Sequence, residues 1–342
     1  MLKHGIDYFM EVYIKEIAYF LPKKVVSNEE LVKEFPEWSV DKIADKVGVC
    51  ERHVASSDET ATDLAVLAAE VLFAKGTVKR EDIDFVLFCT QSPDYKLPSS
   101  ACIIQDRLGL GTHCGSFDFN LGCSGYEYGL AVAKGLVVAG ISSNVLLLTG
   151  ETYNHYLHPR DKGNRTIFGD GASATVISTE GFAAIGEFSL GTDGSGAKHL
   201  IVKSGGARFP KKLNDLKFDD GGNPISSDYL NMDGQEIFAF TLTKVPKMMK
   251  DVLMKNGLQK EDVNLFVFHQ ANKYMLEHLR KKLKIEEEKF FNNLAFVGNT
   301  VSSTIPIALF DAREQGKLKG IVLLAGFGVG LSWGATVIRI ME

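Results

Sequence analysis

The sequence predicts a mixed α/β fold built from two similar halves. Short apolar segments of the kind that form buried strands alternate with amphipathic segments of the kind that form helices. The 342 residues are enough for two domains of ordinary length. A segment of the first half recurs in the second, because residues 81–89 (EDIDFVLFC) align without gaps with residues 261–269 (EDVNLFVFH). The 33 glycines are too many for a simple helical bundle.

A second set of matches follows further along the chain. Residues 144–150 (NVLLLTG) align with residues 320–326 (GIVLLAG), and residues 174–177 (ATVI) align with residues 335–338 (ATVI). The alternative explanation is that apolar strands resemble one another by chance. Because the matches come in the same order in both halves, we favour an internal repeat.

The repeat divides the chain into residues 1–180 and 181–342. Strands in the first half are rich in Val, Leu, Ile and Phe, which is the pattern of strands buried on both faces. They are expected near residues 84–90, 115–120, 144–150 and 173–178. Helices are expected near residues 61–75, 99–108, 124–139, 237–256, 273–283 and 303–315. The polar, glycine-rich residues 191–231 are expected to form an insertion or a connection between the halves.

The composition indicates a globular protein and excludes several classes of function. Apolar residues make up 45% of the chain, which is enough apolar surface to offset the entropy cost of folding. The charge balance of 38 basic and 43 acidic residues gives −5, so the chain as a whole has no electrostatic reason to bind nucleic acid. No apolar run reaches the roughly 18 residues of a membrane span, so no membrane association is expected.

The cysteines and the N-terminal residues favour a cytoplasmic location. The five cysteines are odd in number and show no C-x-x-C spacing, so neither a disulfide framework nor a metal site is expected. Residues 1–10 carry charges and no small-residue cleavage site, so no signal peptide is expected.

Three residues suited to chemistry occupy related positions. At an offset of 176, Cys123 falls opposite Asn299, and each follows a glycine between a predicted strand and a predicted helix. His269 ends an apolar strand just before the helix that begins at Lys273. If the two halves are related by pseudo-symmetry, these three side chains share a central cleft.

Each of these residues also has a simpler structural explanation when taken alone. The helix dipole at Cys123 favours a thiolate, but small buried cysteines are common. His269 alone would be a core histidine, and Asn299 and Asp170 alone would be turn residues. The loop at residues 326–330 (GFGVG) does not fit the G-x-G-x-x-G pattern and is followed by a strand, so dinucleotide binding is not expected.

Five motifs occur along the chain in a characteristic order. They are DFNLGCSGY (118–126), IFGDGA (167–172), HQAN (269–272), GNT (298–300) and the glycine-rich residues 326–334. In these motifs the chain resembles the ketoacyl-acyl-carrier-protein synthase III family, a condensing-enzyme branch of the thiolase superfamily. The resemblance covers essentially the whole chain and favours a functional role for Cys123, His269 and Asn299 together.

The resemblance implies a fold, an assembly and a reaction. The fold is α/β, a thiolase-like five-layer α-β-α-β-α arrangement of two pseudo-symmetric halves, and the assembly is a homodimer. Residues 1–180 supply the nucleophile Cys123, which takes an acyl group from a thioester. Residues 181–342 supply His269 and Asn299, which donate hydrogen bonds to a malonyl thioester as it loses CO₂. His269 is therefore expected to be neutral, with its Nε2–H directed inward.

The resemblance also implies which residues contact the substrates. The backbone of Cys123 and of Gly328, Val329 and Gly330 is expected to form the oxyanion hole. The residues expected to line the substrate tunnel are Lys42, Lys46, Leu97, Lys162, Ile167, Phe168, Gly234, Gln235, Phe238, Ala271 and Asn272. Acyl carrier protein is the expected partner, with acyl-coenzyme A or acyl-carrier-protein and malonyl-carrier-protein as substrates and no cofactor or metal.

Several of these positions depart from the family pattern and leave an alternative open. Lys42 and Lys46 stand where many members have a Trp and an Arg around the coenzyme A adenine, and Val329 interrupts the usual run of three glycines. The alternative is a specialised acyltransferase that passes the acyl group to an amine or a hydroxyl without decarboxylation. Its setting would be secondary metabolism or the synthesis of surface lipid or polysaccharide.

Overall fold

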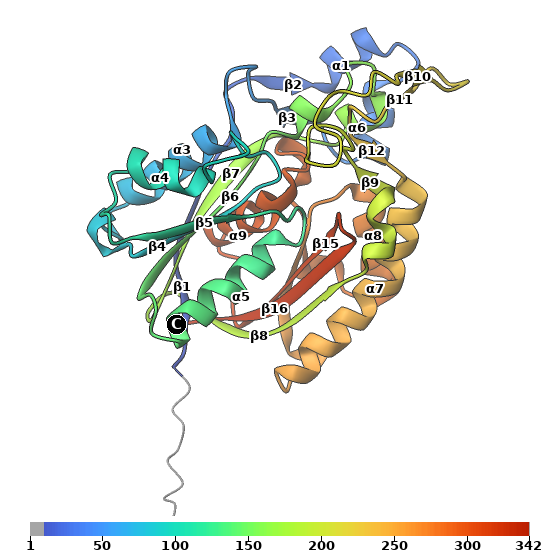
Figure 1. The fold of residues 1–342 in the computed structure, drawn as a ribbon. Helices are drawn as coiled ribbons and strands as arrows, with labels where there is room; N and C mark the ends of the chain where they lie inside the picture. The colour runs from blue at the N-terminus through green and yellow to red at the C-terminus, as the bar shows by residue number, and fades with distance from the viewer. Residues whose placement is uncertain (1–9, 342) are drawn as a thin grey trace, which may run out of the picture.

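A ten-stranded mixed sheet forms the centre of the protein (Figure 1). The structure is a computed structural model that describes residues 10–341, so the signal-peptide expectation, which rests on residues 1–10, falls almost wholly outside it. In spatial order the strands of the sheet are β14 (Phe290–Phe291), β13 (Val263–Phe268), β15 (Ile321–Gly328), β16 (Ser332–Ile340), β8 (Ala183–Thr192), β1 (Tyr13–Phe20), β7 (Gly171–Ser178), β6 (Asn144–Glu151), β4 (Phe85–Cys89) and β5 (Gly115–Phe119).

The two ends of the sheet repeat one pattern of strand directions. β4 is parallel to β6, and β6 is antiparallel to β7. Likewise β13 is parallel to β15, and β15 is antiparallel to β16. The two groups of five strands meet where β1 pairs with β8, through Tyr13 opposite Ala184 and Ile14 opposite Ala183. We retain the division of the chain after residue 180 as our proposal, and this strand order supports it.

Helices cover the outer face of each strand group, and further helices lie between the two groups. The helices are α1 (Asn28–Glu34), α2 (Val40–Lys46), α3 (Ala61–Ala74), α4 (Ser100–Arg107), α5 (Gly125–Val138), α6 (Lys162–Arg165), α7 (Gly234–Lys255), α8 (Lys273–Leu283) and α9 (Thr304–Glu314). Short 3₁₀ turns lie at Arg80–Asp82, Tyr153–Tyr156, Gly194–His199, Lys260–Asp262, Glu287–Lys289, Leu294–Phe296 and Val301–Ser303.

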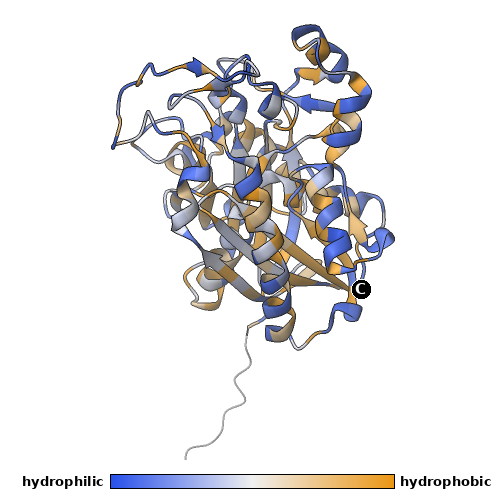
Figure 2. Ribbon diagram, turned by 90° about the vertical axis from the view of Figure 1, so that its right-hand side faces the viewer, coloured by the Kyte–Doolittle hydropathy of each residue, from blue (hydrophilic) through white to orange (hydrophobic). Residues whose placement is uncertain are grey.

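The helices and the sheet together make five layers. α3 and α4 pack on one strand group, and α7 and α8 pack on the other. α5 and α9 lie between the two groups and share one apolar cluster, in which Leu130 and Ala133 meet Ile305 and Leu309. The predicted five-layer fold of two similar halves is therefore confirmed. Figure 2 shows the apolar residues concentrated along the strands and the inward helix faces.

Local sequence signals explain why the helices begin where they do. At α3, the Thr60 side chain accepts a hydrogen bond from the Asp63 backbone N–H, and the Asp63 side chain accepts one from the Thr60 backbone N–H. Behind this cap, Leu64, Ala68 and Leu72 recur at helical spacing and are fully buried. All six predicted helices and all four predicted strands are present, and their ends differ from the prediction by no more than three residues.

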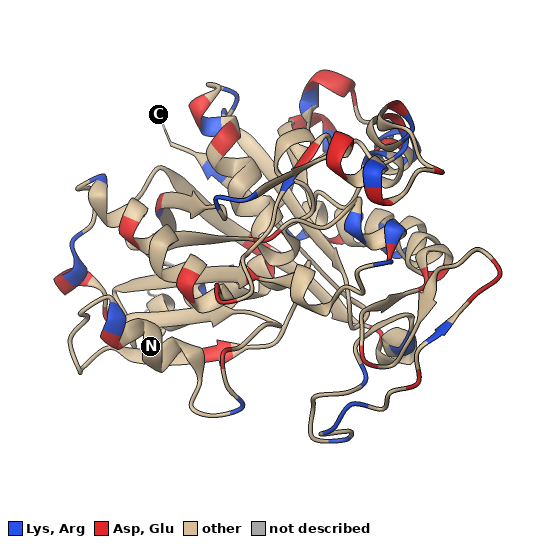
Figure 3. Ribbon diagram, turned by 90° about the horizontal axis from the view of Figure 1, so that it is seen from above, with Lys and Arg blue, Asp and Glu red and all other residues tan. Residues whose placement is uncertain are grey.

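Of the two expectations for the polar segment at residues 191–231, the structure shows an insertion, because the segment lies within the second half between β8 and α7 and forms small pairs of strands. These are β9 (Leu200–Ile201) with β12 (Asn231–Met232) and β10 (Lys217–Phe218) with β11 (Pro224–Ile225). A similar pair, β2 (Val25–Ser27) with β3 (Glu51–His53), lies in the first half. Charged residues lie mainly on the outer helices and on such loops (Figure 3).

Two further observations concern the cysteines and the helices. All five cysteines carry free thiols. Within residues 10–341, no helix combines the length and the apolar character that a membrane crossing requires.

Candidate active site

A small buried cavity of about 80 Å³ lies where the two halves meet. The first half contributes Cys123 to its wall, and the second half contributes His269 and Asn299. All three side chains are almost fully buried. The structure therefore brings together the three residues singled out from the sequence.

Cys123 lies at the turn that leads from β5 into α5. The turn is tight, because the Gly125 N–H donates to the Gly122 carbonyl at 2.7 Å. A Cβ built on Gly122 would lie 2.5 Å from a methyl group of Val329, and one built on Gly328 would lie 2.9 Å from the Cys123 sulfur. Glycine at positions 122 and 328 thus lets the β15–β16 loop approach the thiol directly.

The thiolate expected at Cys123 is not favoured in this structure. Burial raises the pKa of the Cys123 thiol to about 12, and the nearby Glu151 carboxyl adds to the increase. The backbone N–H groups of Val329 and of Cys123 itself act in the opposite direction. α5 begins only at Gly125, and at this buried position the loss of solvation outweighs the helix dipole. The expectation of a thiolate is therefore corrected to a neutral thiol.

His269 follows β13 and is held by the start of α9. Its Nδ1 lies 2.7 Å from Oγ1 of Thr304, so Nε2 is the ring nitrogen left for the cavity. Burial lowers the pKa of His269 to about 3, and the Val301 carbonyl only partly opposes this. The imidazole is therefore neutral, as expected from the sequence. The Nε2–H form requires the Thr304 hydroxyl to donate to Nδ1 in place of the hydrogen bond that it donates to the Val301 carbonyl, and this tautomer stays a prediction.

Asn299 is oriented as a donor toward the cavity. Its Oδ1 accepts a hydrogen bond from the Val301 N–H at 2.9 Å, and its Nδ2 donates to the Ala271 carbonyl at 3.3 Å. One N–H of the amide remains for a ligand. The backbone of Asn299 is paired with residues of the first half, since its N–H donates to Ile167 and its carbonyl accepts from Gly169.

Val301 connects the two donors. Its N–H donates to the Asn299 amide oxygen, and its carbonyl accepts a hydrogen bond at 3.0 Å from the Thr304 hydroxyl, which also contacts His269. Val301 has φ of 56°, a left-handed conformation that is strained for a β-branched residue. The surrounding contacts of this fully buried residue must offset that strain. Nothing in the sequence around Val301 indicates this role.

The chain matches one family of proteins along most of its length. Residues 117–194 match 3-oxoacyl-[acyl-carrier-protein (ACP)] synthase III, and residues 253–340 match the C-terminal part of the same family. Beta-ketoacyl-[acyl-carrier-protein] synthase III of Clostridium perfringens (strain ATCC 13124) is 36% identical over 324 residues, which are 94% of this chain and 97% of that protein. The protein of the same name from Caldanaerobacter subterraneus subsp. tengcongensis is 35% identical, over 94% and 95% of the two chains.

The chain belongs to the 3-oxoacyl-[acyl-carrier-protein] synthase III family. Solved structures agree with this. A crystal structure of a 3-oxoacyl-(acyl-carrier-protein) synthase III has a TM-score of 0.94 at 48% identity and covers 96% of this chain and 100% of its own. The synthase III of Pseudomonas aeruginosa PAO1 has a TM-score of 0.85 at 31% identity, over 97% and 99%. The predicted family is confirmed, and with it an acyl-transferring condensing enzyme.

Three loop residues of this synthase III family member were predicted to supply backbone donors, namely Gly328, Val329 and Gly330. The structure brings two of the three to the thiol. Gly328 lines the Cys123 cavity, and the Val329 N–H lies close enough to the sulfur to affect its pKa. Gly330 does not line this cavity. The Cys123 N–H also acts to lower the pKa of its own thiol. The oxyanion hole itself remains a proposal.

The residues predicted for the synthase III tunnel fall into two groups. The first group lines the Cys123 cavity and consists of Ile167, Phe168, Gly234, Ala271 and Asn272. The second group does not line it and consists of Lys42, Lys46, Leu97, Lys162, Gln235 and Phe238.

The residues of the second group have other surroundings. Lys42 stacks over the Trp38 ring at 5.0 Å. Lys162 binds Glu37 at 2.8 Å and the Gly221 carbonyl at 3.1 Å. Phe238 packs against Tyr274, and Leu97 is 82% exposed on a loop. Their roles in a tunnel stay predictions.

Sequence reasoning missed several apolar residues of the cavity. They are Tyr153, Leu200, Met232, Ile237, Met275 and Phe327. Leu200 and Met232 come from the polar connecting segment and its edge, where no periodic pattern marks them as buried. Tyr153 and Leu200 also line a neighbouring cavity of about 520 Å³, so this wall separates the cysteine from a larger space.

Proposed function

We propose that the protein condenses an acyl thioester with malonyl-acyl-carrier-protein in a decarboxylating Claisen reaction. The observation that carries the proposal is that one buried cavity is lined by a thiol, an imidazole and an oriented amide. Family membership supports it, because the relatives are named as synthases of 3-oxoacyl groups on acyl carrier protein. We propose that no cofactor or metal takes part.

In the first step, Cys123 takes the acyl group. The sulfur attacks the thioester carbonyl carbon, a new C–S bond forms, and the carrier thiol leaves with the proton from Cys123. Backbone N–H groups of Cys123 and of residues 328–330 stabilise the negative oxygen of the tetrahedral intermediate. Transfer of the proton to the leaving thiolate suits a resting state in which the thiol is neutral.

In the second step, the malonyl group loses CO₂. The electrons of the broken C–C bond move onto the thioester oxygen, where Nε2–H of His269 and Nδ2–H of Asn299 donate hydrogen bonds. The resulting enolate carbon attacks the acyl carbonyl on Cys123 and a C–C bond forms. The cysteine sulfur leaves as a thiolate and is reprotonated from solvent. A neutral His269 is suited to this role because a donor, not a base, is needed.

Two variants test this division of roles. With a labelled acyl thioester, wild-type protein should become labelled and Cys123→Ala should not. Asn299→Ala should still be labelled but should release CO₂ from malonyl thioester far more slowly. Equal labelling of wild type and Cys123→Ala, or loss of labelling in Asn299→Ala, would contradict the assignment.

The mass of the product separates condensation from plain acyl transfer. Condensation adds two carbons to the acyl group and releases CO₂. A product with the acyl group on an amine or a hydroxyl, formed without CO₂ release, would favour the alternative.

We further propose that the protein is a cytoplasmic homodimer. β5 lies at one end of the sheet and pairs only with β4 among the described strands, so its outer edge is free to pair with a second copy. Light scattering should give twice the mass of one chain. A single-chain mass at micromolar concentration would contradict this.

A further inference from the structure

A wall of two side chains, Tyr153 and Leu200, separates the Cys123 cavity from the neighbouring cavity of about 520 Å³. Within residues 10–341 these two are the lining residues that both cavities have in common. The larger cavity carries further apolar side chains, among them Tyr156, Val202 and Leu230. It would therefore accommodate a long acyl chain if the wall were open.

The ring of Tyr153 is held firmly in this wall. The side chain is 4% exposed, and its ring packs against Phe168 at 5.3 Å and against Tyr156 at 6.0 Å between centroids. Its phenol donates a hydrogen bond to Oε1 of Gln91, and Nε2 of Gln91 donates in turn to Oδ1 of Asn120 at 2.9 Å. Burial raises the pKa of Tyr153 well above its usual range, so the phenol keeps the proton that it donates.

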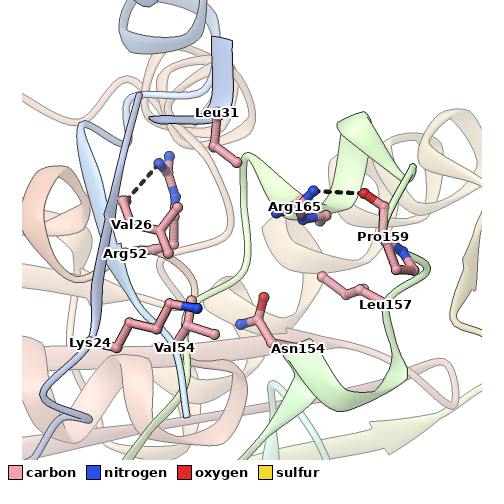
Figure 4. A pocket seen from close by; sticks show the side chains of 9 residues that line it. All are labelled: Lys24, Val26, Leu31, Arg52, Val54, Asn154, Leu157, Pro159 and Arg165. Carbon is pink, nitrogen blue, oxygen red and sulfur yellow. Dashed lines mark hydrogen bonds between the residues drawn. The ribbon is translucent and has the colours of Figure 1, made fainter. Parts of the chain in front are cut away.

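The acceptor of the Tyr153 phenol is itself fixed by its backbone. The Gln91 N–H donates to both carboxyl oxygens of Glu151, at 3.0 and 3.1 Å, and the Gln91 carbonyl accepts from the Tyr156 hydroxyl at 3.0 Å. The residue after Tyr153, Asn154, lines a separate cavity of about 210 Å³ (Figure 4). That cavity shares no lining residue with the other two, so it offers an acyl chain on Cys123 no further room.

The Cys123 cavity has room for a short acyl group only. An apolar cavity of about 150 Å³ holds a benzene molecule, so about 80 Å³ corresponds to about three or four carbon atoms. We propose that Tyr153 determines the length of the acyl group, so that Cys123 accepts chains of about two to four carbons and the Tyr153 ring excludes longer ones from the larger cavity. This inference rests on the proposed acyl transfer to Cys123 and adds the class of acyl group.

Acylation of Cys123 by acetyl and octanoyl thioesters of N-acetylcysteamine tests the proposal, with mass spectrometry of the intact full-length chain as the measurement. The small carrier thiol is the same in both compounds, so only the acyl group differs. Wild type should react at least about 100-fold faster with the acetyl thioester, because the additional methylene groups do not fit. Equal rates would overturn the role of Tyr153 and leave the proposed function standing. No acylation by either compound would overturn both.

Matched variants assign the preference to one ring. Tyr153→Ala opens the wall and should raise the ratio of the octanoyl rate to the acetyl rate about 100-fold. Tyr156→Ala is the control, because Tyr156 lines the larger cavity but not the Cys123 cavity, and it should keep the ratio of wild type. If thermal unfolding shows that Tyr153→Ala does not fold, Tyr153→Leu repeats the test with an expected rise of about tenfold. An unchanged ratio in the folded Tyr153 variant, or an equal rise in Tyr156→Ala, would overturn the proposal.

Discussion

Gly328 leaves the space that the Cys123 sulfur needs. A Cβ at this position would lie 2.9 Å from Sγ and 3.0 Å from the Cβ of Cys123. Gly328→Ala should therefore displace the nucleophile and slow acylation of Cys123 by about 100-fold. Acylation rates followed by mass spectrometry check this.

The matched control is a glycine with free space around it. Gly135 lies on the exposed face of α5, and a Cβ there meets no atom within 4 Å. Gly135→Ala should leave acylation unchanged and stabilise the protein by about 0.5–1 kcal/mol. If Gly328→Ala acylates as fast as Gly135→Ala, the close approach has no functional meaning.

The pKa of Cys123 gives a second prediction. Because burial raises this pKa to about 12, the thiolate fraction at neutral pH is far below that of an ordinary cysteine with pKa 9.0. Alkylation of Cys123 by iodoacetamide should be slow at neutral pH and should still rise tenfold per pH unit at pH of about 10, where an exposed thiol has levelled off. Peptide mass spectrometry distinguishes Cys123 from the exposed Cys102. A plateau of the Cys123 rate near neutral pH would show a thiolate instead.

At the scale of single elements, α9 positions the imidazole. The hydroxyl of its first residue, Thr304, lies 2.7 Å from Nδ1 of His269 and donates a hydrogen bond to the Val301 carbonyl. Thr304→Val keeps the shape and removes the hydroxyl. Decarboxylation of the malonyl thioester should fall about tenfold, the equivalent of one lost hydrogen bond, while acylation of Cys123 should change little.

A conservative variant shows whether position or fold is responsible. Thr304→Ser restores the hydroxyl and should recover most of the decarboxylation rate. If Thr304→Val slows acylation and decarboxylation equally and also lowers the melting temperature, Thr304 has only a structural role.

Element positions could be read from the sequence better than their contacts. Periodicity and capping are local, so α3 is marked by Thr60, Asp63 and the spacing of Leu64 and its neighbours. The left-handed Val301 could not be read in this way, because surrounding contacts hold a β-branched residue in a conformation that its own sequence disfavours.

The candidate active site could also be predicted in its positions but not in its contacts. The matching glycines before Cys123 and Asn299 marked the turns that meet in the cavity. The ionisation of Cys123 depends on how completely the other half covers it, and this depth of burial is a property of the whole fold. The contacts of Lys42 with the Trp38 ring and of Lys162 with Glu37 also depend on the folded chain, and the sequence alone did not indicate them.

At the scale of the whole molecule, the buried neutral His269 links stability to pH. Its pKa is lowered from 6.5 to about 3, so the unfolded chain binds a proton below pH 6.5 while the folded protein resists it. This residue's contribution to stability is present above pH 6.5 and is lost as the pH falls toward 3. Between pH values of about 7 and 5, wild type should therefore lose more thermal stability than His269→Gln.

Differential scanning calorimetry at both pH values measures this difference. The sign of the difference between the two proteins is the informative quantity, because the other titratable groups contribute equally to wild type and to the variant. An equal loss of thermal stability in wild type and His269→Gln would mean that the imidazole is protonated at the same pH in the folded protein as in the unfolded chain.

Synthesis on the ribosome gives the strand order a further consequence. All five strands of the first group lie within residues 13–178, so that group is complete before β8 is translated. α5 receives its apolar cover only when α9 emerges, beginning at residue 304, which is 304 − 178 = 126 residues later. During this interval a nascent chain exposes an apolar helix face and an unpaired β1 edge, the features that promote aggregation and chaperone binding. The architecture that joins two half-sites into one cavity thus makes the second half the protective cover of the first during translation.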